Sequence, residues 1–456
     1  MKLKFVFLFI IAGLVQFSFA LTFSDPSTLK IAVFDVNATP PVGSQLTYGQ
    51  MKNSDDLSLR AKGIILIGAG KPIVLCAIDW IGIANESQDI FKDSLAKAAE
   101  TTPDRVVVHT LHQHDAPICD FTAEKILKRN NMSLYCFDGT FARRLIKDIQ
   151  LSITSSLLNA QPITQIGLGK AVVYNVASNR RINKKDGKVG AMRGSSSADS
   201  VLRAMPEGLI DPEISLISFW NDNKPVAILS FYATHPQSYY LTNIANPDFV
   251  GIARYFRQLA VPDALHIHFN GAGGNIAAGK YNDGNHENRL ILAERMADGM
   301  KRAWGSTQKY PIKAADVKWL TEPLLLPYNP KIADVEKNMR EKGNEGYYIS
   351  NSLSRFGWYV RRKEGKSIET SCLSMGNARL LFMPGELFVE YQLAAKNMAP
   401  DKFVAMAAYG DYGPSYIGTQ EAYSEGGYEI EVSPVTSDAE KIIMNVIKTL
   451  LAKSDK

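Results

Sequence analysis

The stretch that decides the fold runs from Val106 to Pro117 and reads Val-Val-Val-His-Thr-Leu-His-Gln-His-Asp-Ala-Pro. Its three β-branched residues predict a buried strand. Three histidines follow within six positions, although the whole chain has only seven. Side chains two apart in an extended backbone share a face, so we expect His112 and His114 to project together from the strand end. This pattern suits a zinc ligand with a polar neighbour, while two surface histidines in a polar turn are the competing interpretation.

The segments around this stretch predict a mixed α/β fold. Hairpins are expected at residues 63–79 and 214–234, the second turning at 221–224, and a further strand at 379–383. Apolar residues at helical spacing predict helices at 88–100, 141–158, 290–304 and 387–398, and a last helix capped by Ser437 or Asp438. Strands alternating with helices, together with hairpins, favour a mixed sheet with flanking helices in one large domain over residues 21–456. The sequence shows no internal repeat.

The first 20 residues have the pattern of a secretory signal peptide. Lys2 and Lys4 precede an apolar run from Phe5 to Val15, and Ser18-Phe19-Ala20 fits a cleavage site. The run is shorter than the roughly 20 residues that span a bilayer, and no other stretch is apolar enough. We therefore expect a secreted or periplasmic protein with no stable transmembrane segment in the mature chain; a retained anchor is the alternative.

Composition excludes some functions. The chain has 51 basic and 46 acidic residues and a formal net charge of +5, which falls to +3 once Lys2 and Lys4 are removed. No Lys/Arg-rich run is present, so we expect no nucleic-acid partner. Four cysteines are too few for a disulfide framework in a chain this long, although a bridge between Cys119 and Cys136 stays open.

Two more histidine segments follow predicted strands. His235 follows an apolar strand, and Pro236 ends that strand because proline has no backbone N–H to donate to the sheet. Residues 265–275 place His266 and His268 on a strand that runs into a glycine-rich turn, where backbone amides can approach a ligand closely. The alternatives are a structural histidine and a tight strand-to-helix turn. A P-loop is excluded because no Gly-Lys-Ser/Thr follows.

These segments, taken in order, resemble the catalytic domain of the neutral/alkaline ceramidases, which are secreted or membrane-associated zinc amidases. The family's Thr-His-Thr-His-Ser-Gly-Pro is similar to residues 111–117, and its Asn-x-Asn-Arg to residues 177–180. Its Val-Asp-Pro and Val-His-Pro-Thr-Ser are similar to residues 210–212 and 234–238. Its Pro-Ala/Gly-Glu-Phe and Asn-Asp-Tyr-x-x-Tyr-Val-Thr-Thr are similar to residues 384–387 and 410–419, the latter with one insertion. The order agrees from about residue 30 to 430.

The resemblance implies a Zn²⁺ cofactor held by His112, His235, Glu386 and Tyr416, with His114 and Arg180 facing the substrate carbonyl or its oxyanion. Zinc-activated water would then attack an N-acyl amide of a small or lipid-like substrate, and His114 would carry a proton to the leaving amine. We expect Asn270, Gly271 and Tyr423 to contact the substrate.

This sequence differs from the ceramidase pattern in two ways, so the substrate is not identified by the resemblance. The family's glycine-rich turn carries a serine thought to act at the scissile amide, and Gly271 stands in its place here. The family's C-terminal immunoglobulin-like domain has no counterpart in this sequence. The alternatives are a zinc hydrolase of an ester or a sugar N-acyl group, and a non-catalytic binding protein on the same fold. The serine run at 194–198 is not a nucleophile elbow, because no strand precedes it.

Overall fold

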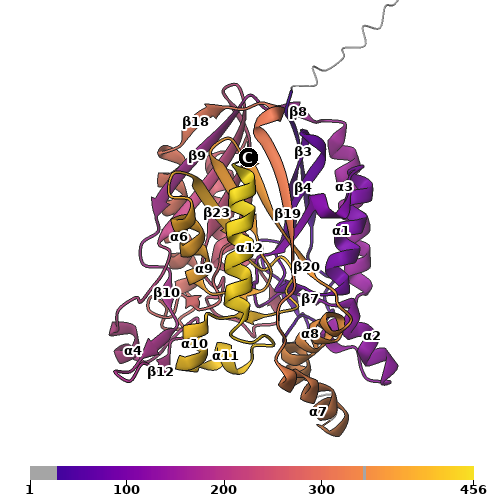
Figure 1. Cartoon of the computed structure of the whole chain (residues 1–456), viewed down its shortest axis with the longest axis vertical. Helices are drawn as coiled ribbons and strands as arrows, with labels where there is room; N and C mark the ends of the chain where they lie inside the picture. Colours follow the sequence, from indigo (N-terminus) through magenta and orange to yellow (C-terminus); the bar gives the residue numbers. More distant parts are fainter. Residues whose placement is uncertain (1–27, 343–345, 456) are drawn as a thin grey trace, which may run out of the picture.

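Three large mixed sheets form the centre of the described structure, a computed structural model that covers residues 28–342 and 346–455 (Figure 1). The predicted signal peptide, residues 1–20, lies outside the described residues. The first sheet has the strand order β6-β4-β3-β1-β8, the second β16-β14-β13-β9-β18 and the third β19-β20-β21-β23. The predicted mixed α/β fold is confirmed, with three sheets where one was expected.

The three sheets repeat one succession of elements. The first unit comprises β1 (Lys30–Asn37), β3 (Arg60–Gly68), β4 (Gly70–Ile78), α1 (Glu86–Ala98) and β6 (Val106–Thr110). The second comprises β9 (Gln165–Val172), β13 (Glu213–Asn221), β14 (Lys224–Tyr232), α5 (Asp248–Ala260) and β16 (Leu265–Asn270). The third comprises β19 (Val317–Leu324), β20 (Ile368–Met375), β21 (Ala378–Phe382), α9 (Val389–Met398) and β23 (Phe403–Ala407).

The strand pairing is the same in each unit. Two antiparallel pairings are followed by one parallel pairing, β4 with β6, β14 with β16 and β21 with β23. A parallel pairing requires a crossover, and α1, α5 and α9 supply it. The repeat is topological, which is why the sequence does not reveal it.

The central strands bury both faces. In β4, Ile73, Leu75 and Ala77 face a core shared by the three sheets, whereas Val74, Cys76 and Ile78 face the helices. Side chains alternate along a strand, so a strand between two apolar layers is apolar at every position. The same reason explains the unbroken apolar run Val106–Val108.

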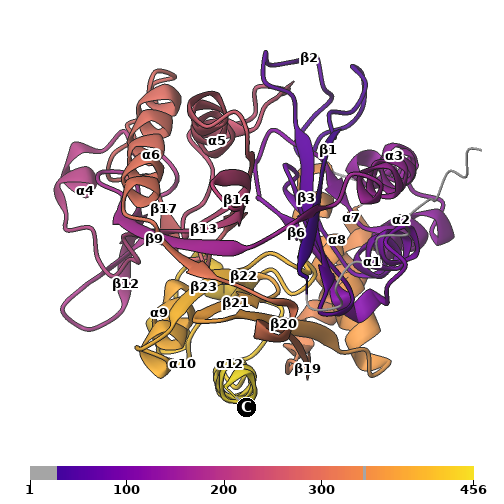
Figure 2. The same cartoon turned by 90° about the horizontal axis from the view of Figure 1, so that it is seen from above.

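Each sheet has helices on its outer side, as the view from above shows (Figure 2). α1 and α3 (Thr140–Leu157) cover the first, α5 and α6 (Asn288–Gly305) the second, and α9 and α12 (Ala439–Ser454) the third. The predicted hairpins and helices are confirmed to within about three residues. Asp438 is the residue before α12, as expected, but its side chain makes no capping hydrogen bond.

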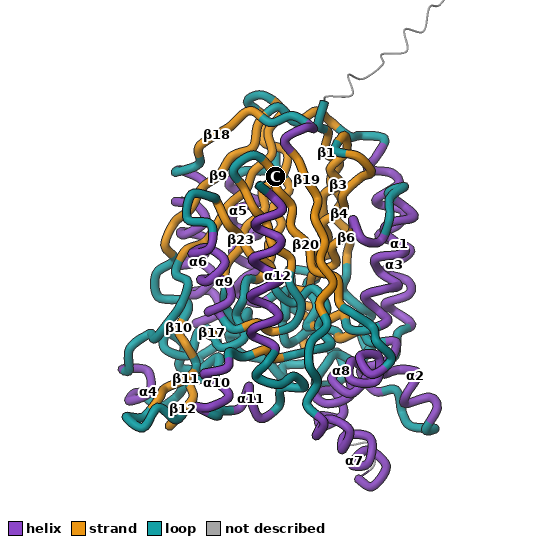
Figure 3. Tube along the Cα trace, viewed as in Figure 1, coloured by secondary structure: helices purple, strands orange, loops and turns teal. Residues whose placement is uncertain are grey.

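Loops gather at one end of the sheets, the lower half of Figure 3. α2 (Phe121–Arg129), α7 (Asp334–Lys342), α8 (Gly346–Lys363), α10 (Gln420–Glu425) and α11 (Tyr428–Glu431) lie at this end. The other short elements are β2 (Asn53–Ser54), β5 (Gly82–Ile83), β7 (Ile118–Cys119), β8 (Gln161–Pro162), β10 (Ser178–Asn179), β11 (Arg181–Asn183), β12 (Val189–Met192), α4 (Ser200–Ala204), β15 (Ile244–Ala245), β17 (Ile276–Ala277), β18 (Gln308–Pro311), β22 (Glu386–Leu387) and β24 (Tyr416–Ile417).

Two sequence questions are answered by the described residues. None of their helices is both long and apolar enough to cross a membrane. Cys119 and Cys136 are buried free thiols, so the bridge left open by the sequence is not formed; Cys119 donates its thiol hydrogen to Ser87 Oγ over 3.2 Å.

Candidate metal centre

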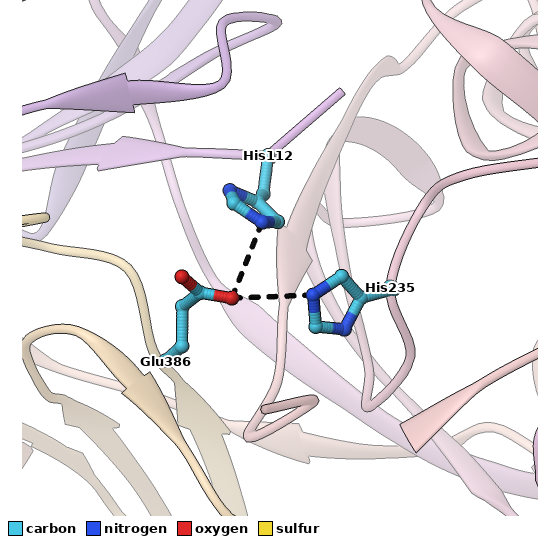
Figure 4. Close-up of side chains that lie close together, drawn as sticks. All are labelled: His112, His235 and Glu386. Atoms are coloured by element: carbon cyan, nitrogen blue, oxygen red, sulfur yellow. Dashed lines mark hydrogen bonds and ion pairs between the residues drawn. The ribbon is translucent and has the colours of Figure 1, made fainter. Parts of the chain in front are cut away.

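Three buried side chains converge on one point where the three units meet. The Nε2 atoms of His112 and His235 lie 3.3 Å and 3.2 Å from the same oxygen, Oε2 of Glu386 (Figure 4). One ligand atom from each residue lies within 4.8 Å of the others. His112 follows β6, His235 follows β14 and Glu386 follows β21, so each unit supplies one group.

His112 reaches this point by a route that the strand pattern did not predict. β6 ends at Thr110, and His112 has a left-handed backbone with φ 69°. The argument from alternating side chains in an extended strand is therefore wrong for His112 and His114. Their rings still lie together, with centroids 4.8 Å apart, because the backbone turns between them. Hydrogen bonding fixes that turn, since the His112 amide donates to the Trp80 carbonyl oxygen over 2.9 Å.

Backbone carbonyl groups set the tautomer of both histidines. His112 Nδ1 lies 2.8 Å from the Ile81 carbonyl oxygen, and His235 Nδ1 lies 2.7 Å from that of Gly273. A carbonyl oxygen only accepts, so Nδ1 carries the proton and Nε2 presents a lone pair. Burial lowers the pKa of His235, which favours this neutral form.

The site fits a divalent metal ion. In the neutral tautomer given by the Nδ1 contacts, two Nε2 lone pairs and a carboxylate oxygen face one another, and a metal ion satisfies all three acceptors at once. Burial raises the pKa of Glu386, but positive charge and hydrogen bonds from His112 and His235 outweigh it and hold the pKa well below its usual range. A metal ion between the three groups would supply the same positive charge. The separations of 3.2 Å and 3.3 Å match the edge, about 3.3 Å, of a tetrahedron with zinc–ligand bonds of about 2.0 Å.

Tyr416 stands beside this cluster. It pairs with Glu386 in the short parallel ladder of β22 and β24, and its hydroxyl lies 3.4 Å from His235 Nε2. Arg180 Nη1 donates to the Tyr416 hydroxyl oxygen over 3.2 Å. Burial and the charge of Glu386 raise the pKa of Tyr416 well above its usual value, while Arg180 opposes this. The structure thus brings together all four predicted ligands.

His114 and Arg180 line the same hollow. The Nδ1 of His114 lies 3.0 Å from the His112 carbonyl oxygen, so its Nε2 is the basic atom. Its ring stacks on Tyr48 with centroids 5.9 Å apart. Burial, with His112 and His235, holds the pKa of His114 well below its usual value. Arg180 Nε lies 3.7 Å from the fully buried carboxylate of Glu429.

The hollow beside the cluster has a volume of about 280 Å³. Its lining is polar or aromatic apart from Val432. Several of these residues had no predicted role: Tyr48, Gln237, Tyr240, Arg355, Tyr412, Ser415, Tyr428 and Val432. Gln237, Tyr412 and Ser415 lie inside the motifs already quoted and could have been found there. Arg355 lies on α8, where no motif marks it.

The predicted substrate contacts Asn270, Gly271 and Tyr423 do not line this hollow, and their contact with substrate stays a prediction. Asn270 is completely buried at the end of β16. A Cβ on Gly271 would lie 2.5 Å from Gln392 Oε1 and 3.1 Å from Ala233 Cα, so Gly271 faces packed atoms. The Tyr423 hydroxyl donates to the Val435 carbonyl oxygen over 2.8 Å.

The later part of the glycine-rich turn is the part that reaches the centre. Gly273 and Ile276 present their carbonyl oxygens to His235, and the Gly274 amide donates to the Leu387 carbonyl oxygen over 2.8 Å. No serine occurs between residues 239 and 305. His266 and His268 of β16 stay in the core, where His268 Nδ1 lies 2.8 Å from Ser230 Oγ.

Fold and site together define a three-unit α/β protein with a buried His/His/Glu centre. The sequence matches no protein-family model and no curated protein. Among solved structures, neutral ceramidase from Pseudomonas aeruginosa superposes with a TM-score of 0.66 at 17% identity, over 94% of this chain and 75% of that one. A ceramidase complexed with C2 gives a TM-score of 0.65 at 15% identity, over 94% and 76% of the two chains. The chain therefore has the neutral ceramidase fold, which confirms the resemblance at the level of the fold.

Proposed function

We propose that this protein is a zinc-dependent hydrolase of an N-acyl amide bond. The observation that carries the proposal is the set of inward-facing acceptors, His112 Nε2, His235 Nε2 and Glu386 Oε2, at the edge of a polar hollow. The ceramidase fold supports an amide as the bond cleaved. With Tyr416 as a fourth ligand beside the three nitrogen and carboxylate ligands, zinc would take up water or substrate by expanding to five-coordination, as catalytic zinc sites can.

The roles of the side chains follow from their contacts. When bound, zinc polarises a carbonyl group and lowers the pKa of water to about 7. His112, His235, Glu386 and Tyr416 would hold the ion. His114 has a basic Nε2 at the hollow, which suits it to accept a proton from water and deliver it to the leaving amine.

Arg180 completes the set with a positive charge. Burial opposes that charge, but Tyr416 and Glu429 raise the pKa of Arg180 above its usual value. The guanidinium therefore stays protonated beside the position where an oxyanion would develop. Because the glycine-rich turn carries no serine, the proposal relies on water and not on a serine nucleophile.

The test combines metal analysis with a substrate panel. We expect the purified protein to bind about one zinc per chain and to hydrolyse N-acyl amides, with activity lost on chelation and restored by zinc. Esters and N-acyl sugars that carry the same acyl chain show which type of bond is hydrolysed. Full hydrolysis in the absence of metal, or no hydrolysis of any amide by the zinc-loaded protein, would refute the proposal.

A further inference from the structure

Arg355 brings a second cation to the hollow, on an element outside the three repeated units. It lies on α8 and lines the hollow together with Tyr412, Ser415 and Tyr416. Its Nη1 donates to the Val432 carbonyl oxygen over 2.6 Å, and its Nη2 to Ser352 Oγ over 3.3 Å. Both partners are neutral.

Arg355 has no ion-pair partner among the described residues, although the charge of Glu386, in the same hollow, favours its protonated form. Its Nε is buried and makes no hydrogen bond, and no carboxylate of residues 28–342 or 346–455 forms an ion pair with it. Arg180 differs, because Glu429 lies 3.7 Å away. The Arg355 side chain is half-buried, so part of its guanidinium is open to a ligand in the hollow.

The shape and lining of the hollow indicate which part of a substrate enters. A volume of about 280 Å³ and a single aliphatic residue, Val432, suit a small polar group and not an acyl chain. The amine-derived side of an amide is therefore the part that reaches Arg355. A guanidinium binds a carboxylate through charge-assisted hydrogen bonds, which are about twice as strong as neutral ones.

From this we propose that the substrate is an N-acyl amino acid, whose carboxylate is bound by Arg355. This inference rests on the proposed amide hydrolysis and names its substrate class. The charge on the amine side, two bonds from the scissile nitrogen, distinguishes this class from neutral N-acyl amino alcohols. Arg355 is a specificity residue here and takes no part in the bond cleavage.

The experiment compares three ligands with one acyl chain: N-hexanoylglycine, N-hexanoylethanolamine and N-hexanoyl-phosphoethanolamine. Equilibrium binding is measured by calorimetry on metal-free protein, so that neither turnover nor a carboxylate–metal bond contributes. We expect N-hexanoylglycine to bind wild type roughly 10- to 100-fold more tightly than the ethanolamine, the range of one charge-assisted pair. Arg355→Gln should abolish this preference, and Arg355→Lys should retain part of it.

The matched control is Arg361→Gln, on the same helix. Arg361 pairs with Asp89 at 2.6 Å and is not in this lining, so its loss should leave the preference unchanged. Melting temperatures verify that each variant is folded. Equal binding of glycine and ethanolamine forms by wild type overturns the inference, as does an equal loss of both in Arg355→Gln. Tighter binding of the phosphate overturns the choice of carboxylate. Failure of the zinc-loaded wild type to hydrolyse any of the three contradicts the proposed function and leaves the binding comparison decisive.

Discussion

Glu386 is the residue on which both histidines converge, because its Oε2 alone lies 3.2–3.3 Å from each Nε2. It follows Gly385, whose φ of 65° turns the chain out of β21. Its other oxygen accepts a hydrogen bond from Ser415 Oγ over 3.3 Å. One carboxylate thus joins the second and first units to the third, and its charge is what makes the cluster a cation site.

Glu386→Gln should weaken zinc binding by more than about 100-fold, since even the loss of an outer hydrogen-bonding partner costs 10- to 100-fold. The amide keeps the size of the side chain but removes the negative charge. Zinc affinity is measured by competition with a chromogenic chelator. The control is Glu421→Gln, an exposed glutamate on α10. Unchanged zinc affinity in Glu386→Gln would mean that the carboxylate serves only the local fold.

His114→Gln separates proton transfer from metal binding. His114 is next to the cluster, yet its Nδ1 is occupied by the His112 carbonyl oxygen. We expect zinc content to stay at the wild-type level and kcat on the cleaved amide to fall by about 10²- to 10⁴-fold. His286→Gln, at an exposed histidine, serves as the control. If zinc content instead falls in proportion to kcat, His114 supports metal binding and not proton transfer.

At the scale of elements, the turn after β16 positions the centre through its backbone. Gly273 holds the ring of His235, and Gly274 packs against the chain at Glu386. A Cβ on Gly274 would lie 2.3 Å from the Glu386 carbonyl oxygen, an approach that a side chain does not tolerate. The glycines of this turn are therefore required by close packing of two units.

Gly274→Ala should destabilise the fold by about 1–3 kcal/mol and lower zinc affinity, because the backbone at Glu386 has to move. Gly305→Ala is the matched control: that glycine ends α6, and a Cβ there would have no atom within 4 Å. At this position, alanine should be neutral or stabilise by up to about 1 kcal/mol. Denaturant unfolding measures both changes. Equal stability of the two variants would contradict the role given to the turn.

At the scale of the whole molecule, the centre ties together three units that are otherwise joined by their common core. His112, His235 and Glu386 each follow a strand of a different sheet. An ion bound by all three stabilises only the arrangement in which the units are docked, so binding is linked to global stability.

Removal of zinc should therefore lower the melting temperature. Zinc at 1,000 times its Kd adds about 4 kcal/mol to the free energy of unfolding. Calorimetry with chelator, and again after zinc is restored, checks the shift. The zinc-dependent shift in melting temperature should be retained in His114→Gln and absent in Glu386→Gln. A melting temperature that is independent of zinc in the wild type would show that the ion does not link the units.

Local periodicity predicted the elements, and the resemblance to ceramidase motifs predicted the residues of the centre. Hairpins, helices and strand ends follow from local periodicity, and His112, His235, Glu386 and Tyr416 were marked by motifs at those ends. Local patterns suffice for the elements because each depends on residues close together in the sequence.

Features that depend on contacts between distant segments could be seen only in the folded protein. The docking of three sheets around one core, the packed position of Gly271 against Gln392 and the place of Arg355 in the hollow depend on segments that are distant in the sequence. The backbone of His112 is decided in the same way, since its φ of 69° is held by contacts with Trp80 and Ile81 and not by its own strand. No periodicity encodes such contacts, because each depends on the packing of one unit against another.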